Sequence, residues 1–505
     1  MTNWRASLSR LRPANRLARD LLTTTGTSVI ATIAGVATIR LLAGGLGPEE
    51  FGAYTLSRRV LATIVPISTL SMGVAIPRYL GVAQDDAEGA RVFLAGLLLT
   101  VAPGLVFALI GGALATPLSR LLFHADGYSV LLLATLVAVL GYSLYTALYS
   151  QYRGTRQMWK ANLWQTALSS LGPLLVALVY ARRGHADLVV GAGAAITGAT
   201  LVPLVALTLG ALERCGGRAA IRGELQRLAQ YGLPRVAGGF ALGGLFSVGP
   251  FLAPHFGSLR EAGYLSAGQS ALLVLEGGLA SFGIVALPEM ARLVGQGRRQ
   301  EIRGIVQEIV ALVLHTGLFG LVQGVMWADV IVSVLLGPEY AQAVPIMRIV
   351  VLASAPYLAY VMLRSVIDAV EERAVNTLNL FLAVLVSTAL GVGLASAGLG
   401  AVGLACGISA GFMTLGSSTV LFLHRTYPVD WKALRFLEVL GLNLLLAALV
   451  VLVRSRLLAG VAGSGLVAGA GGTVGAAFLV YLTALWHMKV TWLARIREGL
   501  AVTRP

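Results

Sequence analysis

The stretch LAGGLGPEEFGAY, residues Leu42 to Tyr54, forms a short polar break between two long apolar segments. It contains the adjacent residues Gly47 and Pro48, two glutamates and two aromatic residues. Glycine and proline interrupt regular structure more strongly than other residues, so this pair predicts a tight turn. Because each flanking segment is long enough to cross a bilayer, the stretch predicts a turn between two membrane-spanning helices.

The composition of the whole chain supports a membrane environment. Of its 505 residues, 57% are hydrophobic and only 12% are charged, whereas soluble domains carry roughly 25% charged residues. A water-soluble core could not hold so much apolar sequence, so we expect an all-α polytopic membrane protein. A window of about 20 apolar residues predicts about 14 transmembrane helices. They are expected near 22–46, 55–81, 90–115, 128–150, 161–182, 188–211, 231–255, 262–288, 303–333, 345–370, 377–398, 400–423, 434–454 and 464–486.

The basic residues indicate which side of the membrane each loop faces. An even number of helices places both termini on one side, and most of the 38 lysines and arginines fall in the tails and loops of that side. The positive-inside rule therefore predicts cytoplasmic termini for a protein of the cell membrane. The net charge of +15 is explained by this topology. We therefore expect no binding to nucleic acid.

The opening pattern returns in the second half of the chain. LAPHFGSLREAGY, at Leu252–Tyr264, matches it at leucine, alanine, glycine and tyrosine with one constant offset. MGVAIPRYL, at Met72–Leu80, parallels FGIVALPEM, at Phe282–Met290. Ordered matches of this kind indicate duplication of a six-helix unit. Because six crossings return the chain to its starting side, the copies are expected to be related by a pseudo-two-fold axis along the membrane normal.

These features predict the organisation of the chain. A basic interfacial arm is expected over 1–20, an N-terminal lobe over 21–211, a cytoplasmic linker over 212–230, a C-terminal lobe over 231–424, a further helix pair over 434–486 and a cytoplasmic tail over 487–505. Every connection between predicted helices is short, so none is expected to fold as a soluble catalytic domain.

Four segments resemble the polysaccharide-export flippases, which share a superfamily with multidrug efflux carriers and peptidoglycan-precursor flippases. They are IRLLAGGLGPEEFGAYTL at 39–56, GVAIPRYL at 73–80, GTRQMWKANL at 154–163 and LLGPEYAQAVPIM at 335–347. The resemblance implies two six-helix bundles in a MATE-like V, with a central cavity lined mainly by the first, second, seventh and eighth helices. It also implies translocation of polyprenyl-pyrophosphate-linked oligosaccharides to the outer leaflet without a change of bonds. The implied partners are this lipid-linked substrate, membrane lipids and other proteins of polysaccharide assembly.

A pyrophosphate head group needs a cationic path through the membrane, and arginine suits it because its planar fork can hold phosphate through two hydrogen bonds. The candidates on the expected lining helices, with one on the tenth helix, are Arg40, Arg58, Arg59, Arg78, Arg235 and Arg364. All six lie near an expected membrane face, where snorkelling to the interface is the alternative. Arg58 and Arg59 stand out as an adjacent pair within the second helix, on the outer side, where basic residues are scarce.

Glu276 and His315 are expected near the middle of the membrane. Coupling to H⁺ or Na⁺ is the functional interpretation, and a structural tie between helices is the alternative. Tyr142, Tyr145 and Tyr149 lie on one face of the fourth helix. They are candidates to contact sugar, with packing as the alternative. We expect no metal site and no cofactor, with coupling to H⁺, Na⁺ or the membrane potential left open.

Three other functions remain as alternatives. An efflux carrier for organic cations shares the fold, but an arginine-rich cavity disfavours cations. A membrane glycosyl-transferring enzyme would need a substantial outer loop with catalytic residues, and the sequence carries neither GxxxxGK nor HExxH. A non-transporting scaffold of cell-wall assembly would need no polar cavity. We therefore favour a flippase that is not an enzyme.

Overall fold

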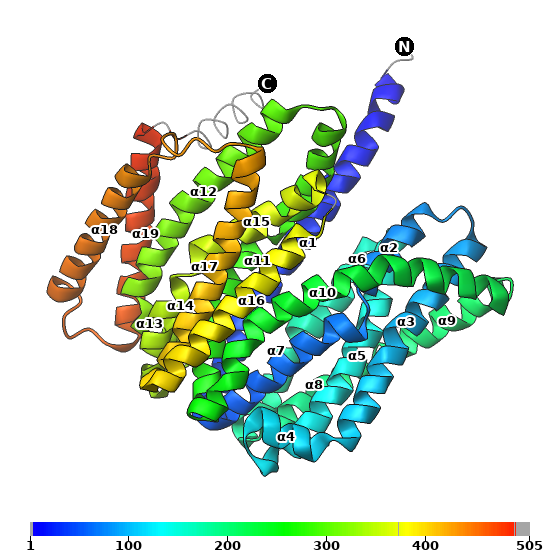
Figure 1. The fold of residues 1–505 in the computed structure, drawn as a ribbon, viewed down its shortest axis with the longest axis horizontal. Coiled ribbons are helices and arrows are strands. Elements are labelled where there is room, and N and C mark those ends of the chain that lie inside the picture. Colours follow the sequence, from blue (N-terminus) through cyan, green and yellow to red (C-terminus); the bar gives the residue numbers. More distant parts are fainter. Residues whose placement is uncertain (1–3, 372, 489, 491–505) are drawn as a thin grey trace. The chain divides into compact units, whose positions relative to one another are not determined.

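The computed structural model describes residues 4–371, 373–488 and 490, without the side chains of 4–25, 28–29, 126, 218–220, 276–289 and 291. Over this described part the chain is helical, with no strand (Figure 1). The helices pack into two compact units, residues 1–247 and residues 248–505. The prediction of an all-α polytopic membrane protein is confirmed.

The first unit is built from ten helices, the last of which continues past its boundary. They are α1 (Trp4–Ser68), α2 (Met72–Val82), α3 (Asp86–Ala113), α4 (Ala115–Phe123), α5 (Ser129–Gly154), α6 (Met158–Thr166), α7 (Gly172–Tyr180), α8 (Ala186–Gly198), α9 (Leu201–Arg214) and α10 (Arg218–Phe256). A π-helical turn, Ala167–Leu171, joins α6 to α7. Since α10 begins at Arg218, most of the expected linker is part of the same helix as residues 231–255.

The turn predicted at Gly47 and Pro48 is present as a break within α1. Gly47 has φ 75° and ψ 169°, which is not helical, whereas the residues before and after it form helices. Glycine adopts a positive φ without a steric penalty. Proline supplies no backbone N–H, so it can begin the helix that follows the break. The residues of the opening stretch therefore separate two helices as expected.

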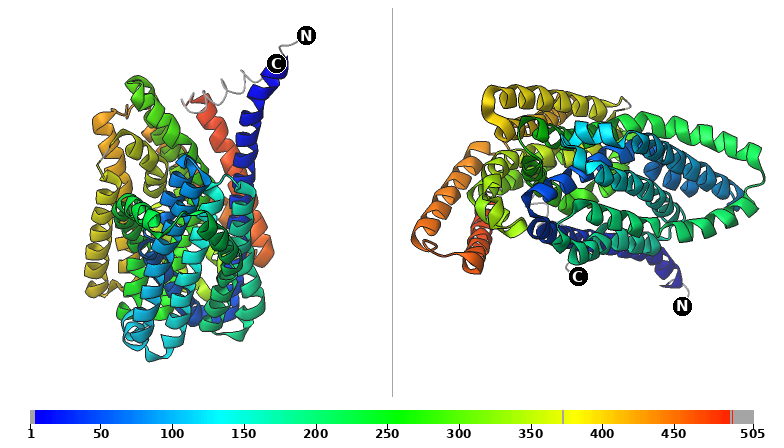
Figure 2. Two further views of the ribbon diagram at one scale, coloured as in Figure 1. Left: turned by 90° about the vertical axis from the view of Figure 1, so that its right-hand side faces the viewer. Right: turned by 90° about the horizontal axis from the view of Figure 1, so that it is seen from below.

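The second unit contains the remaining helices. They are α11 (Leu259–Gly295), α12 (Arg299–Met326), α13 (Ala328–Leu335), α14 (Val344–Val351), α15 (Ser354–Val370), α16 (Val375–Leu394), α17 (Gly400–Thr426), α18 (Phe436–Arg456) and α19 (Gly463–His487). The segments Pro338–Val351 and Ser354–Val370 meet at an angle of 50°. Helices α18 and α19 lie side by side, and α18 packs against α12 (Figure 2).

The predicted number of transmembrane helices is not confirmed. In the described residues, 10 helices are long and apolar enough to cross a membrane, or up to 11 if the bent pair is one span. Two of these segments, Ile30–Val82 and Val375–Thr426, each cover two of the predicted helices because the helical hydrogen bonding is nearly continuous. The protein is thus a multi-pass membrane protein, while the count of fourteen and the pseudo-two-fold relation stay predictions.

A line of glycines brings α10 against the end of α1 within the first unit. A Cβ atom on Gly232 would lie 2.3 Å from the carbonyl oxygen of Leu70, and one on Gly243 would lie 3.1 Å from that of Ala62. Such distances leave no room for a side chain, so the two backbones are in direct contact. At this contact Leu70 and Ser71 both have positive φ, 46° and 56°, and they separate α1 from α2.

Candidate functional site

A cavity of about 80 Å³ lies inside the first unit, between α1, α5, α7 and α8. Most of its lining is apolar and small, including Gly172 and Pro173 of α7 and Ala194 of α8. Its charged residue is Arg58 of α1, and the phenol rings of Tyr54 and Tyr142 stand beside it. The volume has room for a few water molecules or a small polar group.

Arg58 is positioned by the helix that follows the Gly47 break. Its Nη1 donates to the hydroxyl oxygen of Tyr54, one helical turn earlier, at 3.3 Å. The preceding residue, Ser57, is buried and shares a 2.5 Å hydrogen bond with Thr135 of α5, which fixes this turn of α1. Arg58 itself is exposed, and within the described residues it forms no ion pair with a carboxylate. Its charge is therefore available to an anion.

Arg59, predicted to act with Arg58, occupies a different environment. It is only 8% exposed, and its guanidinium lies 5.7 Å from the ring centre of Phe246 on α10. Its carbonyl oxygen accepts from Thr63 at 2.8 Å and from Ser247 at 3.4 Å. Successive residues of an α-helix differ in direction by about 100°. The structure therefore places Arg58 at the cavity and Arg59 in the packing between α1 and α10.

The three predicted tyrosines form a ladder on one face of α5. The ring centres of Tyr142 and Tyr145 are 6.3 Å apart, and those of Tyr145 and Tyr149 are 5.5 Å apart. Arg153 lies 5.5 Å from the ring centre of Tyr149. Tyr149 also donates to Gln165 at 3.1 Å. Of the three tyrosines only Tyr142 lines the cavity, so it is the one placed to meet a ligand there.

Tyr54 was not among the residues predicted from the sequence. The signal was available, because Tyr54 ends the opening stretch and lies four residues before Arg58, on the same helical face. Tyrosine offers both an apolar ring and a hydroxyl group, so it can orient an arginine within an apolar wall. The cavity therefore combines one arginine with two tyrosines.

The other candidate arginines are distributed over three further places. Arg40 is exposed on α1, with Nη1 3.7 Å from where a Cβ of Gly44 would lie. Arg364 belongs to the second unit, 5.7 Å from the ring centre of Tyr360. Arg78 and Arg235 meet at the ring of Tyr231, at 4.6 and 3.8 Å from its centre. None of these four lines the cavity that holds Arg58.

Of the two predicted coupling groups, the side chain of Glu276 lies outside the described residues. His315 of α12 is fully buried in the second unit. Its Nε2 lies 2.9 Å from the carbonyl oxygen of Leu434, which can only accept, so Nε2 carries a hydrogen. The hydroxyl of Tyr481 on α19 donates to the carbonyl of His315 at 2.8 Å. His315 thus connects α12 to the segment before α18 and to α19.

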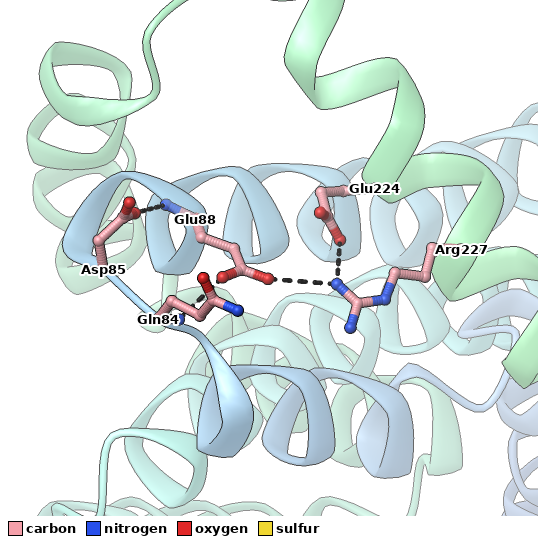
Figure 3. Close-up of polar contacts among 5 residues, drawn as sticks. All are labelled: Gln84, Asp85, Glu88, Glu224 and Arg227. Atoms are coloured by element: carbon pink, nitrogen blue, oxygen red, sulfur yellow. Dashed lines mark hydrogen bonds and ion pairs between the residues drawn. The ribbon is translucent and has the colours of Figure 1, made fainter.

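A second polar cluster lies where α2, α3 and α10 meet (Figure 3). Arg227 of α10 reaches Glu88 of α3 at 3.2 Å and Glu224 at 3.5 Å. Asp85 begins α3 by accepting from the backbone N–H of Glu88 at 2.6 Å. Aspartate at this position satisfies a free N–H of the first turn, which explains its place in the sequence. Asp85 therefore acts as a helix cap.

No group of three or more His, Cys, Asp or Glu side chains that could hold a metal ion occurs among the described residues. Cys215 and Cys406 are both free thiols.

Comparison with known proteins agrees with this description. A family model described as "Polysaccharide biosynthesis protein" matches residues 17–294, which is more than half of the chain. A search of curated protein sequences finds no match.

Solved structures of transporters share the fold. A lipid II flippase, MurJ, in an inward closed conformation aligns with a TM-score of 0.70 at 12% identity, over 93% of this chain and 99% of its own. A multidrug resistance MATE family transporter of the MOP superfamily, in an inward-facing conformation, aligns with a TM-score of 0.64 at 15% identity, over 80% of this chain and 95% of its own. At these identities the similarity establishes the fold. With the fold of MurJ and the MATE transporters and a match over most of its first unit, the chain belongs to the polysaccharide biosynthesis protein family.

Proposed function

We propose that this protein flips polyprenyl-pyrophosphate-linked oligosaccharides from the inner to the outer leaflet of the cell membrane, by alternating access, during polysaccharide biosynthesis. Family membership and the fold of known flippases and transporters support this proposal. The observation that carries it is the exposed Arg58, which has no carboxylate partner among the described residues, at a cavity lined by membrane-spanning helices.

An arginine in this apolar surrounding requires an interaction that compensates for its charge. On insertion scales a charged side chain costs about 2.5–3.5 kcal/mol at the centre of a bilayer, and less near the membrane face where Arg58 is expected. A bound anion would offset this cost, and the guanidinium fork matches two oxygens of a phosphate. Only Tyr54 contacts the guanidinium through a described hydrogen bond, which leaves most of its N–H donors for a ligand. Arg58 would therefore hold a phosphate of the head group as it crosses the membrane.

In a more open state of the alternating-access cycle, the sugar portion would meet the aromatic side of the cavity. Tyr142 presents a half-buried ring to the cavity, and the ring of Tyr145 lies edge-on to it with the ring centres 6.3 Å apart. A tyrosine ring can stack on the apolar face of a sugar, and its hydroxyl group can exchange hydrogen bonds with sugar hydroxyls. Several contacts of this weak kind suit a substrate that has to be released on the other side.

The main rival is an efflux carrier for organic cations. A positive group in an apolar wall repels a cationic ligand, and Arg58 has no carboxylate partner among the described residues to cancel its charge. Acidic side chains would be the expected lining for a cation site. An anionic lipid head is therefore the better match to this cavity.

Direction of transport requires an energy source, which we propose to be H⁺, Na⁺ or the membrane potential. Glu276 is the predicted coupling group of greatest interest because a carboxyl group within an apolar helix must be neutral, paired or wetted. If the rate of flipping by a Glu276→Gln variant keeps its dependence on pH and Na⁺, the coupling role proposed for Glu276 is wrong.

The function can be tested in vesicles that contain the purified protein and a fluorescent polyprenyl-pyrophosphate oligosaccharide. Quenching of the outer leaflet measures how fast the lipid changes leaflets. Arg58→Gln is expected to lower the rate about tenfold or more, because a charged hydrogen bond to the phosphate is lost. The flipping rate of Arg58→Lys should lie between the rates of the wild type and Arg58→Gln, since lysine keeps the charge and lacks the planar fork of arginine.

Arg182→Gln is the matched control. Arg182 is an exposed arginine between α7 and α8 of the same unit, and it lies outside the cavity lining. Its variant should flip lipid at the wild-type rate. A wild-type protein that leaves the lipid in place but takes up a cationic dye would replace the flippase proposal with the efflux function.

A further inference from the structure

Two arginines from different helices converge on one tyrosine ring, apart from the cavity that holds Arg58. Arg78 of α2 donates from Nη1 to the hydroxyl oxygen of Tyr231 at 3.0 Å, and its guanidinium lies 4.6 Å from the ring centre. Arg235 of α10 lies 3.8 Å from the same ring centre and donates from Nη1 to the carbonyl oxygen of Tyr231 at 2.7 Å. A single aromatic ring therefore holds two positive charges.

The contrast with a neighbouring arginine shows that no carboxylate in the described part of the chain balances the two charges. Arg227 lies on the same face of α10, four residues before Tyr231, and two carboxylates neutralise it (Figure 3). Arg78 and Arg235 are both exposed, and neither forms an ion pair with a carboxylate of the described chain. Like charges held this close repel one another, so an anion between them would stabilise the arrangement.

Close packing holds α10, which carries Arg235, against α2, which carries Arg78, and the residues just before α2. Gly232, next to Tyr231, packs directly on the carbonyl oxygen of Leu70, immediately before α2 begins. Tyr79, next to Arg78, has its ring edge-on to Tyr231 with the centres 5.6 Å apart. Arg227 in turn lies 4.4 Å from the ring centre of Tyr79. The arginines are thus held in place before any ligand arrives, which reduces the entropy lost on binding.

The surroundings indicate that the ligand is a lipid. Val74 and Val82 lie one turn before and one turn after Arg78 on the same face of α2, and they are 55% and 62% exposed. Leu233, two residues before Arg235, is 54% exposed. Arginine flanked by exposed valines and leucine is typical of the membrane interface, where apolar side chains meet lipid tails and the guanidinium meets head groups.

We propose that Arg78, Tyr231 and Arg235 form a binding site for the phosphoryl head group of a membrane lipid. The two guanidinium groups would each donate to phosphate oxygens, and Tyr231 would keep them in position. Polyprenyl pyrophosphates and anionic phospholipids such as phosphatidylglycerol present the same phosphoryl chemistry. The inference goes beyond the proposed function because it concerns binding alone and holds for a protein that flips no lipid.

The test is a titration of the full chain, purified in neutral detergent, with three probes. These are a polyprenyl pyrophosphate, phosphatidylglycerol and inorganic pyrophosphate, with bound lipid counted by native mass spectrometry. For at least one of the two lipids, the Arg78→Gln/Arg235→Gln double variant should bind at least tenfold more weakly than the wild type. The lipid that shows the larger loss identifies the source of the phosphoryl group.

Arg222→Gln serves as the matched control, since Arg222 is an exposed arginine of the same helix outside the site. Its binding should equal that of the wild type. The Arg78→Lys/Arg235→Lys variant preserves both charges, so it keeps a measurable site if the glutamine variant fails to fold. It is expected to bind several-fold more weakly than the wild type because lysine lacks the planar fork.

Equal lipid binding by the wild type and both double variants would overturn the site. Binding of inorganic pyrophosphate as tight as that of either lipid would overturn the assignment to a lipid. Neither result depends on transport, so failure here is distinguishable from failure of the flippase proposal.

Discussion

Arg454 holds both carboxylate oxygens of Asp329, with Nη1 to Oδ1 at 2.9 Å and Nη2 to Oδ2 at 2.5 Å. The guanidinium also lies 4.9 Å from the ring centre of Trp327, at the junction of α12 and α13. A bidentate arginine–carboxylate pair has more geometric specificity than a single contact. This pair joins the end of α18 to the start of α13, and the hydrogen bond from Tyr481 to His315 joins α19 to α12.

Breaking this pair should loosen the C-terminal helix pair. Asp329→Asn keeps the shape of the side chain and removes its charge, and both partners are about one-third exposed. We expect a loss of about 1–2 kcal/mol of stability, since a charged hydrogen bond is lost in a partly screened setting. Thermal unfolding in detergent measures the change. In a double-mutant cycle, the losses from Arg454→Gln and Asp329→Asn should sum to less than additivity requires, and full additivity would contradict direct pairing.

Gly232 should not tolerate a side chain. Gly232→Ala places a methyl group 2.3 Å from the carbonyl oxygen of Leu70, so α10 or the start of α2 must move. Overpacking of this kind costs about 1–3 kcal/mol. Gly223→Ala is the control on the same helix, because nothing lies within 4 Å of its added methyl.

The control variant should be neutral or slightly stabilising, because alanine favours a helix over glycine by about 0.8–1 kcal/mol. Melting temperatures of the two variants in one detergent provide the comparison. Equal melting temperatures would show that the backbones of α10 and Leu70 are not in contact.

The tyrosines of α5 should differ in their effect on transport. Tyr142→Ala removes a ring from the cavity and should lower the flipping rate about 2- to 10-fold, the range expected for one aromatic contact. Tyr149→Ala removes a ring that packs against Tyr145 and Arg153 away from the cavity, so its rate should stay near the wild type. The same fluorescence-quenching assay measures both. A larger loss for Tyr149→Ala would remove Tyr142 from the proposed sugar contact.

His315 should act on stability rather than on ion dependence. His315→Ala leaves the carbonyl oxygen of Leu434 without its described side-chain donor in a buried setting, which costs about 1–3 kcal/mol. His315→Gln can still donate and should recover part of that loss. Because Nε2 is already engaged, the dependence of flipping on pH and Na⁺ should stay unchanged in both variants. A shifted pH profile with normal stability would instead support the predicted coupling role.

Local sequence patterns predicted some of these features and missed others for physical reasons. The break at Gly47 and Pro48 was predictable because both residues act through their own backbones. The break at Leu70 and Ser71 carries no such residue, since their positive φ values arise where α10 presses on that segment. Tertiary packing of this kind leaves no local pattern in the sequence.

The candidate site was also only partly predictable from local sequence patterns. The sequence identified Arg58 and Arg59 together, as an adjacent pair of arginines in an apolar helix, although adjacent residues of an α-helix differ in direction by about 100°. Which of the two faces a cavity depends on the helices packed around α1, and that packing is not encoded in α1 itself. Tyr54 and Tyr231 were missed because an arginine's aromatic partner is recognised only when both elements are placed.

The π-helical turn at Ala167–Leu171 lets the cavity wall accommodate a change of one residue in chain length. The N–H of Gly172 donates to the carbonyl of Ala167, five residues back, so the turn holds one residue more than an α-helix would. Deleting one of these five residues would return the turn to α-helical geometry without rotating the following segment, because the turn already accommodates one extra residue. Gly172 and Pro173 would then keep their places in the cavity lining. A single-residue deletion in the regular part of α7 would instead rotate the residues that follow by about 100°. Among related chains, a one-residue gap at this turn would accordingly preserve the pocket, and the same gap a few residues later would not.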